Sequence, residues 1–246
     1  GVRLFERRQR RVFLTEAGDR LYQVVREGLG QIRETAQALR QQSRPQSLVL
    51  SCEPTLLMRW LIPRWPAFQA LHPELDVHLM AGGGALSFGS GIDLAIRRND
   101  FDWPEDLHSQ LLFEELTGPV CQPGKVAQFF AQEEAGLALH PAAPRLHTKT
   151  RPDAWQAWLQ HAGQPASDEG AGQTFEHFYF SLQAAVAGLG VAIGPCRLVC
   201  DDLEAGLLVA PLGFVPDGTG YHLLAPARPE PGSAHEKLAN WLHSLS

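Results

Sequence analysis

The 246-residue sequence contains no apolar run that approaches the roughly 18 to 20 residues a membrane-spanning helix needs. It also lacks the charged start, apolar stretch and small-residue cleavage site that mark a secretory signal. These absences argue against a membrane-spanning or secreted protein. The chain opens on Gly1 rather than on methionine, so we expect that a further segment precedes it.

Cysteine is scarce, and its four positions are far apart except for the pair Cys196 and Cys200. A disulfide-stapled scaffold would carry a denser and more regular pattern. No second pair of ligands is spaced to complete a metal site with these two cysteines, and the ten histidines form no ligand motif. We therefore expect reduced thiols packed in the protein interior, no metal and a cytoplasmic location.

The common motifs of nucleotide-binding proteins and hydrolases are also missing. The glycine-rich stretch at 81–91, AGGGALSFGSG, has neither the lysine of a phosphate-binding loop nor the glycine order of a dinucleotide-binding turn. No serine lies in a G-x-S-x-G context. The sequence therefore predicts no enzyme and no cofactor, and residues 81–91 are interpreted as a flexible connection that lines a cleft.

Positive charge is unevenly distributed in this acidic chain. Lys and Arg total 21 against 27 Asp and Glu, for a formal charge of −6. Within the first eleven positions, however, one acid, Glu6, stands against five arginines: Arg3, Arg7, Arg8, Arg10 and Arg11. Two short extended pieces, 2–5 and 11–15, flank this basic tip, so the pattern indicates a small basic hairpin.

A long helix is predicted after the hairpin, over 15–42, where no proline occurs. Thr15 suits the N-cap position of that helix. One stripe of apolar residues recurs at spacings of three and four, namely Leu21, Val25, Leu29, Ile32, Ala36 and Leu39. Such a long helix with a narrow apolar seam usually pairs with a partner helix, although packing against its own domain is the alternative.

Beyond a linker at 42–46 the pattern changes to short apolar strands alternating with helices, which predicts α/β architecture with parallel sheets. Strands are expected at 47–52, 75–81, 92–97, 116–123, 190–195 and 221–226. Helices are expected at 55–73, where Pro63 and Pro66 disturb the pattern, and at 124–132, 152–162, 178–187 and 233–245.

The junctions between strands and helices carry the candidate binding residues. Thr55 would present a hydroxyl beside free backbone N–H groups, where a small carboxylate could bind, although simple helix capping is the alternative. Ser181 would lie near the start of another helix. Arg97 and Arg98 could supply a guanidinium for a bidentate contact with a carboxylate, whereas the alternative for at least one of them is solvent exposure.

The sequence resembles LysR-type transcriptional regulators at several places in the right order. LFERRQRRVFLTEAGDRLY is similar to the wing and the helix start of that family, and PTLLMRWLIPRWPAFQALHPELDVHL resembles the opening of its effector domain. GIDLAIRRNDFDWPEDLHSQLL and LQAAVAGLGVAIGP resemble the branch that contains the glycine-cleavage and β-lactamase regulators. The resemblance covers almost the whole chain.

This resemblance implies a fold and a division of the chain. The fold is a type 2 periplasmic-binding-protein-like effector domain of two α/β subdomains, preceded by a long linker helix and by the wing of a winged helix-turn-helix. The expected parts are the wing at 1–14, a dimerisation helix at 15–42, a hinge at 43–47 and the effector domain at 48–246. Its first subdomain comprises 48–117 with 208–246, and its second comprises 118–207. The recognition helix of the family is absent from this chain.

The resemblance also implies the function and its residues. We expect a ligand-responsive regulator that binds double-stranded DNA as a homodimer or homotetramer and senses an amino acid or small organic acid. The alternatives are a solute-binding receptor or a metabolic enzyme on the same scaffold. The implied DNA-phosphate contacts are Arg7, Arg8, Arg10 and Arg11, and the dimer helix presents Leu21, Val25, Leu29, Ile32 and Leu39. The implied effector-binding residues are Ser51, Glu53, Thr55, Arg97, Thr117, Phe178, Ser181 and Tyr221.

Overall fold

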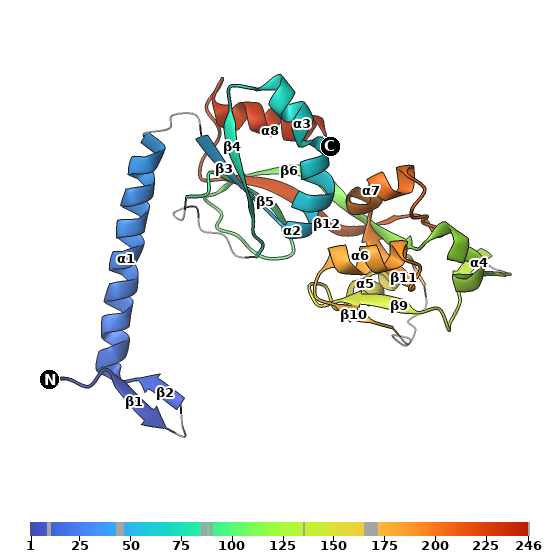
Figure 1. Cartoon of the computed structure of the whole chain (residues 1–246), viewed down its shortest axis with the longest axis horizontal. Helices are drawn as coiled ribbons and strands as arrows, with labels where there is room; N and C mark the ends of the chain where they lie inside the picture. Colours follow the sequence, from blue (N-terminus) through green and yellow to red (C-terminus); the bar gives the residue numbers. More distant parts are fainter. Residues whose placement is uncertain are drawn as a thin grey trace.

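The protein consists of a small hairpin, a long helix and a larger body built on one sheet (Figure 1). The computed structural model describes residues 1–8, 11–42, 47–84, 88, 91–134, 136–164 and 172–245. In those ranges no helix is long and apolar enough to cross a membrane. The same ranges hold no group of three or more His, Cys, Asp or Glu that could bind a metal ion.

The N-terminal hairpin is fixed to the long helix by a side-chain cap. Strands β1 (Phe5–Arg8) and β2 (Arg11–Leu14) pair antiparallel. The Thr15 hydroxyl donates to the carbonyl of Arg3 at 2.7 Å and accepts from the N–H of Gly18 at 3.0 Å. Thr15 is therefore the predicted N-cap of α1 (Glu16–Gln42), and it joins the start of the helix to the segment that precedes β1.

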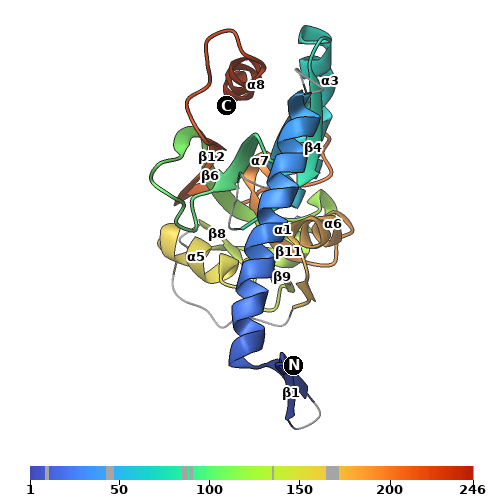
Figure 2. The ribbon, with the colours of Figure 1, turned by 90° about the vertical axis from the view of Figure 1, so that its left-hand side faces the viewer.

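Helix α1 extends from the rest of the molecule and carries the hairpin at its far end (Figures 1 and 2). Four residues of the predicted apolar stripe are exposed: Leu21, Val25, Leu29 and Ile32. The side chain of Leu39 lies outside the described part of the chain, as do the side chains of Arg8, Arg10 and Arg11. No other element in the described part of the chain therefore covers these four residues.

The large sheet has eight strands in the order β10-β9-β11-β6-β12-β5-β3-β4. Parallel strands β3 (Ser47–Cys52), β4 (Asp76–Ala81) and β5 (Leu94–Arg98) form one half of it. Strands β9 (Arg145–Thr148), β10 (Thr174–Phe175) and β11 (Val191–Pro195), also parallel to one another, form the other half. We call these the first half and the second half.

Two longer strands, β6 (His108–Val120) and β12 (Val215–Ala225), cross between the halves. They pair antiparallel with each other, β12 pairs antiparallel with β5, and β6 pairs antiparallel with β11. The α/β architecture is as predicted, but the prediction of parallel sheets is wrong at the centre, where the pairs are antiparallel. Because the chain leaves the first half on β6 and returns on β12, these two neighbours run in opposite directions.

Helices pack on both halves of the sheet. In the first half they are α2 (Pro54–Leu56), a π-helical turn η1 (Leu57–Leu61), α3 (Ile62–Leu71) and α8 (Ala234–Ser244). In the second half they are a 3-10 turn η3 (Pro123–Lys125), α4 (Val126–Phe129), α5 (Ala154–His161), α6 (Phe178–Val186) and α7 (Cys196–Glu204).

The sequence prediction failed in parts of the second half. The expected helix at 124–132 is wrong beyond Phe129, because β7 (Phe130–Glu133) follows and pairs with β8 (Gly136–Leu139) in a small hairpin. Helix α7 and strand β9 were not predicted either. Their short segments mix apolar and charged residues without a clear period, and contacts with β6 and β11 decide their conformation.

One continuous hydrophobic core joins the two halves. Trp60 of η1 is fully buried and packs edge-on against Phe113 of β6, with ring centroids 5.0 Å apart. The same cluster contains Leu182 of α6 and Val199 of α7. Burial of this cluster therefore stabilises each half and also holds the two halves against each other.

Gly118 lies where β6 changes partners between the halves. Thr117 still pairs with Val215 of β12, whereas Gly118 faces Gly194 of β11. A Cβ atom at Gly118 would lie 2.0 Å from the carbonyl oxygen of Gly213. The close approach of two backbones requires glycine at this point.

Gly118→Ala should therefore lower the free energy of unfolding by about 1–3 kcal/mol or more, because backbone must move to admit the methyl group. Urea unfolding measures this change. Gly124→Ala is the matched control, since a Cβ there meets nothing within 4 Å. Equal stabilities of the two variants would show that the backbones are not in close contact at Gly118.

Candidate functional site

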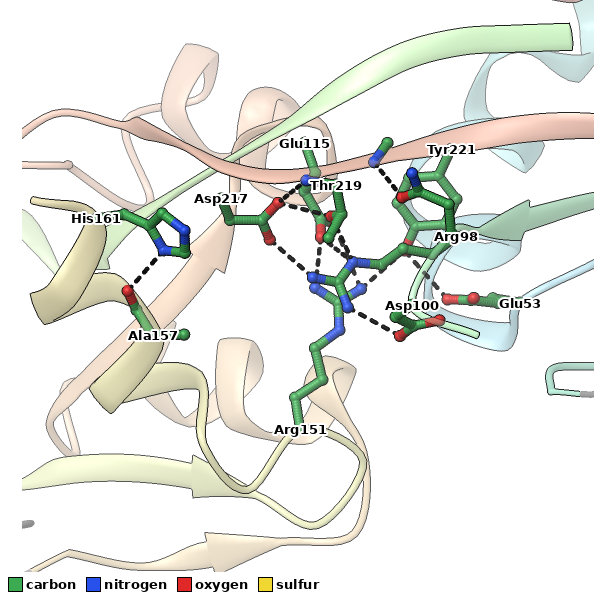
Figure 3. Close-up of polar contacts among 12 residues, drawn as sticks. Glu53, Arg98, Asp100, Glu115, Arg151, Ala157, His161, Asp217, Thr219 and Tyr221 are labelled. Carbon is green, nitrogen blue, oxygen red and sulfur yellow. Dashed lines mark hydrogen bonds and ion pairs between the residues drawn. The ribbon is translucent and has the colours of Figure 1, made fainter. Parts of the chain in front are cut away.

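A network of buried charges lies where β6 and β12 cross between the halves (Figure 3). Arg98, at the end of β5, is at its centre, and its side chain is only 11% exposed. Its guanidinium donates to Asp100 and to Asp217, both at 2.8 Å, and its Nε lies 2.6 Å from the carboxylate of Glu115. Three strands of the sheet are thereby joined through one side chain.

A second guanidinium reaches the network from the second half. Arg151, in the connection between β9 and α5, donates to Glu115 at 2.6 Å and to the hydroxyl of Tyr221 at 3.0 Å. Tyr221 in turn donates to Glu53, at the start of α2, at 3.1 Å. The guanidinium also packs 4.9 Å from the ring of Phe178. This chain of contacts runs from the second half through β12 to the first half (Figure 3).

The network determines the protonation of its members. Burial by itself would lower the pKa of Arg151, but Tyr221 and Glu115 hold that pKa above its ordinary value. Burial, together with the charge of Glu115, raises the pKa of Tyr221 well above 10, so Tyr221 keeps the proton that it donates. Burial would raise the pKa of Asp217, yet hydrogen bonds from Thr219 and the charge of Arg98 hold it below its ordinary value.

A cavity of about 280 Å³ opens beside this network. Its walls come from the crossing strands, from the end of β5 and from the second half. The polar wall includes Arg98, Asp100, Thr117, Arg151, Asp153 and Asp217, and the apolar wall includes Phe178 and Ile193. A concave site with an apolar wall and a few convergent polar groups is the usual form of a small-molecule site.

The structure brings four of the eight residues implied by the resemblance to this cavity or to the network beside it. Thr117 and Phe178 line the cavity. Glu53 and Tyr221 belong to the network. These residues come from β6, from the start of α6, from the start of α2 and from β12, so only the fold brings them together.

The other four residues lie outside the wall of the cavity. Arg97, 2% exposed, donates to the hydroxyl of Ser51 at 2.8 Å inside the first half. Ser181 is buried and donates to the carbonyl of Phe178 at 2.9 Å. Thr55 is half-buried in α2, two residues after Glu53. Of the glycine-rich stretch expected to line a cleft, 85–87, 89 and 90 lie outside the described residues.

Sequence reasoning missed several members of the network. Arg97 and Arg98 were both predicted as candidates to bind a carboxylate, with solvent exposure of at least one as the alternative. That alternative is wrong, because both side chains are largely buried. Nothing in the local pattern marks Glu115, Arg151 or Asp217 as partners. A charged residue inside the predominantly apolar strand β6 was the one available signal, because an acid there needs a buried cation.

Glu115→Gln should destabilise the protein by about 3–5 kcal/mol, because the substitution leaves two buried guanidiniums short of negative charge. Thermal or urea unfolding at pH 7 measures this destabilisation. Glu176→Gln, which breaks the exposed pair with Lys149, is the control and should cost less than about 1 kcal/mol. Similar stabilities of the two variants would mean that the network contributes no more than a surface ion pair.

Comparisons with known proteins agree with this geometry. The model of the LysR substrate binding domain family matches residues 41–246. The HTH-type transcriptional regulator TrpI of Pseudomonas aeruginosa is 40% identical over 248 residues, which is 98% of this chain and 82% of that regulator. The glycine cleavage system transcriptional activator of Escherichia coli K12 is 31% identical over 217 residues, 87% of this chain and 70% of that activator.

A solved structure gives the same result for the fold. The effector binding domain of AmpR from Citrobacter freundii superposes with a TM-score of 0.65 at 27% identity. The match covers 81% of this chain and 98% of that domain.

Proposed function

Because the chain belongs to the LysR family of ligand-responsive transcriptional regulators, we propose that the cavity between its two halves is the effector site. The observation that carries this proposal is the position of the cavity. It lies beside β6 and β12, the two strands that cross from one half to the other. A ligand bound there contacts groups whose spacing depends on how the halves are arranged.

For this function, the chain is divided into the parts that its resemblance to the family implies. The wing occupies 1–14, the linker helix 15–42 and the hinge 43–47. The effector domain then comprises a first subdomain, 48–117 with 208–246, and a second one, 118–207. Thr117 lies at the first boundary and also lines the cavity, which supports a boundary at that point.

The effector is a small molecule, either an amino acid or a small organic acid. A cavity of about 280 Å³ lies just below the usual range of about 300–1,000 Å³ for ligand sites, so it suits a small ligand. Thr117 and Phe178 contact the ligand directly, and Glu53, Thr55 and Tyr221 bind it at the edge of the first half. Ser51, Arg97 and Ser181 support the site from behind, because Arg97 donates to the hydroxyl of Ser51 and Ser181 donates to the carbonyl of Phe178.

The hairpin and α1 serve DNA binding and assembly. LysR regulators bind DNA and small molecules and form oligomers. In this chain Arg7 is exposed on the hairpin, and Arg7, Arg8, Arg10 and Arg11 contact DNA phosphates, which position the protein on the duplex. The exposed stripe of α1, with Leu39, packs against the same helix of a second copy in a homodimer or homotetramer. A regulator that acts on chromosomal DNA works in the cytoplasm.

Ligand binding reaches the DNA-binding part of the protein through the arrangement of the two halves. A ligand shifts their arrangement only by the difference between its affinities for the two states. The arrangement reaches the DNA-binding part through α1, whose free stripe couples two copies. A solute-binding receptor or an enzyme on this scaffold is not favoured, since the relatives described above are named as transcription regulators.

The protein expressed from its complete gene should prefer DNA upstream of its own coding region over random DNA at physiological salt. Replacing Arg7, Arg8, Arg10 and Arg11 by alanine should flatten the salt dependence of binding, by about 0.9 in log–log slope for each phosphate that is no longer neutralised. Arg228→Ala, which removes an exposed arginine outside the hairpin, is the control. Unchanged affinity and slope in the fourfold variant would contradict the role of the hairpin.

Thr55→Val should weaken effector binding about tenfold or more while the fold is kept, because a hydroxyl that bonds a charged ligand group contributes about 1.5–3 kcal/mol. A thermal-shift screen of amino acids and small organic acids supplies the test compound, and calorimetry then measures its Kd. Thr174→Val, at an exposed position of strand β10, is the matched control. Full affinity in the Thr55 variant would remove Thr55 from the site.

A further inference from the structure

The cavity between the halves is richer in negative than in positive charge. Its described wall carries the carboxylates of Asp100, Asp153 and Asp217 against the guanidiniums of Arg98 and Arg151. Behind them, Glu115 contacts both guanidiniums with a side chain that is 3% exposed. Glu53 adds a further carboxylate through the hydroxyl of Tyr221. A ligand with only negative charge would therefore enter a site of its own sign.

Both guanidiniums already have acceptors on this chain. In Arg98 the three nitrogens donate to Thr219, Asp100 and Asp217. In Arg151 the two terminal nitrogens donate to Glu115 and Tyr221. Each guanidinium keeps N–H groups that these contacts do not use, but its positive charge is already balanced by carboxylates of this chain, so a plain carboxylate would add negative charge to a wall that is already acidic.

Two groups on the cavity wall, by contrast, have no partner in the described ranges. The carboxylate of Asp153, just before α5, takes part in no hydrogen bond or ion pair there and caps no helix N–H. The hydroxyl of Thr117 is likewise unbonded in the described part of the chain, although this residue is only 5% exposed. The carboxylate of Asp153 is exposed on the cavity wall and, unlike Asp100 and Asp217, pairs with no arginine in the described ranges, so its negative charge is free to receive a cation from a ligand. The hydroxyl of Thr117 offers a polar contact on the same wall.

We propose that the effector carries a protonated amino group beside a small apolar part, as an apolar amino acid or its amine does. Asp153 receives the ammonium group, the hydroxyl of Thr117 makes a second polar contact, and Phe178 and Ile193 pack on the apolar part. This inference rests on the proposed function of the cavity. Of the two ligand classes proposed there, amino acids and small organic acids, it selects the amino acids.

Matched sets of three compounds test the inference. Each set holds an amino acid, its desamino acid and its decarboxylated amine: leucine, 4-methylpentanoate and 3-methylbutylamine; phenylalanine, 3-phenylpropanoate and 2-phenylethylamine; tryptophan, 3-indolepropionate and tryptamine. Calorimetry and thermal shift on the full protein at pH 7 should show that an ammonium-bearing member binds at least tenfold more tightly than the desamino acid of its set. Asp153→Asn should reduce that preference to less than threefold, whereas Glu204→Gln, an exposed acid on α7, should leave it unchanged.

Three results would overturn the inference. They are equal or tighter binding of the desamino acids, an unchanged preference in the Asp153 variant, and no binding by any ammonium-bearing compound at 10 mM. The proposed function is tested separately by DNA binding. If a desamino acid binds and alters the affinity for the upstream DNA, the cavity remains an effector site and only its ligand class is wrong.

Discussion

The arrangement of the two halves depends on the two ion pairs that the Glu115 carboxylate makes with the guanidiniums of Arg98 and Arg151. Glu115 lies on β6, one of the two strands that cross between them, and is almost completely buried. Arg98 approaches it from the end of β5 and Arg151 approaches from the second half. Removing charges from water is costly, and only mutual pairing with further hydrogen bonds offsets that cost. The network is therefore stable only while strands and halves keep their relative positions.

A second set of ion pairs joins the halves away from the cavity. Arg59 of η1 pairs with Asp202 and donates to the carbonyl of Leu198 at 2.8 Å, and Arg64 of α3 pairs with Asp201 at 2.9 Å. These contacts dock α7 of the second half against helices of the first half. The pair of Arg64 with Asp201 is partly exposed and contributes less than the buried network, whereas the pair of Arg59 with Asp202 is largely buried. These ion pairs and the shared hydrophobic core restrain how far the two halves can move relative to each other. On the side of the buried network, the cavity leaves space for a ligand.

The position of the cavity also connects stability with function. Arg98, Arg151 and Asp217 stabilise the crossing strands and at the same time form the wall of the cavity. A bound ligand therefore changes the electrostatic environment of the groups that hold the halves together. This coupling gives the ligand a physical means to favour one arrangement over another, which is what a ligand-responsive regulator requires.

Local patterns in the sequence were sufficient for several elements. The basic hairpin, the Thr15 cap, the proline-free helix α1 and the strands of the first half depend on composition, spacing and capping within a few residues. Motifs such as LFERRQRRVFLTEAG also identified the family, because they are contiguous. The mixed direction of the sheet, helix α7 and the hairpin β7–β8 were beyond such reasoning, since long-range pairing decides them.

The sequence by itself determined the order of the parts and the family, and only the tertiary structure decided the site. Of the eight residues implied by resemblance, two line the cavity and two join the network, while Arg97, for example, bonds to Ser51 inside the first half. The physical reason is the sequence separation of the partners. Glu115, Arg151 and Tyr221 interact across tens of residues, and a pairing between charges so distant leaves no periodic trace in the chain.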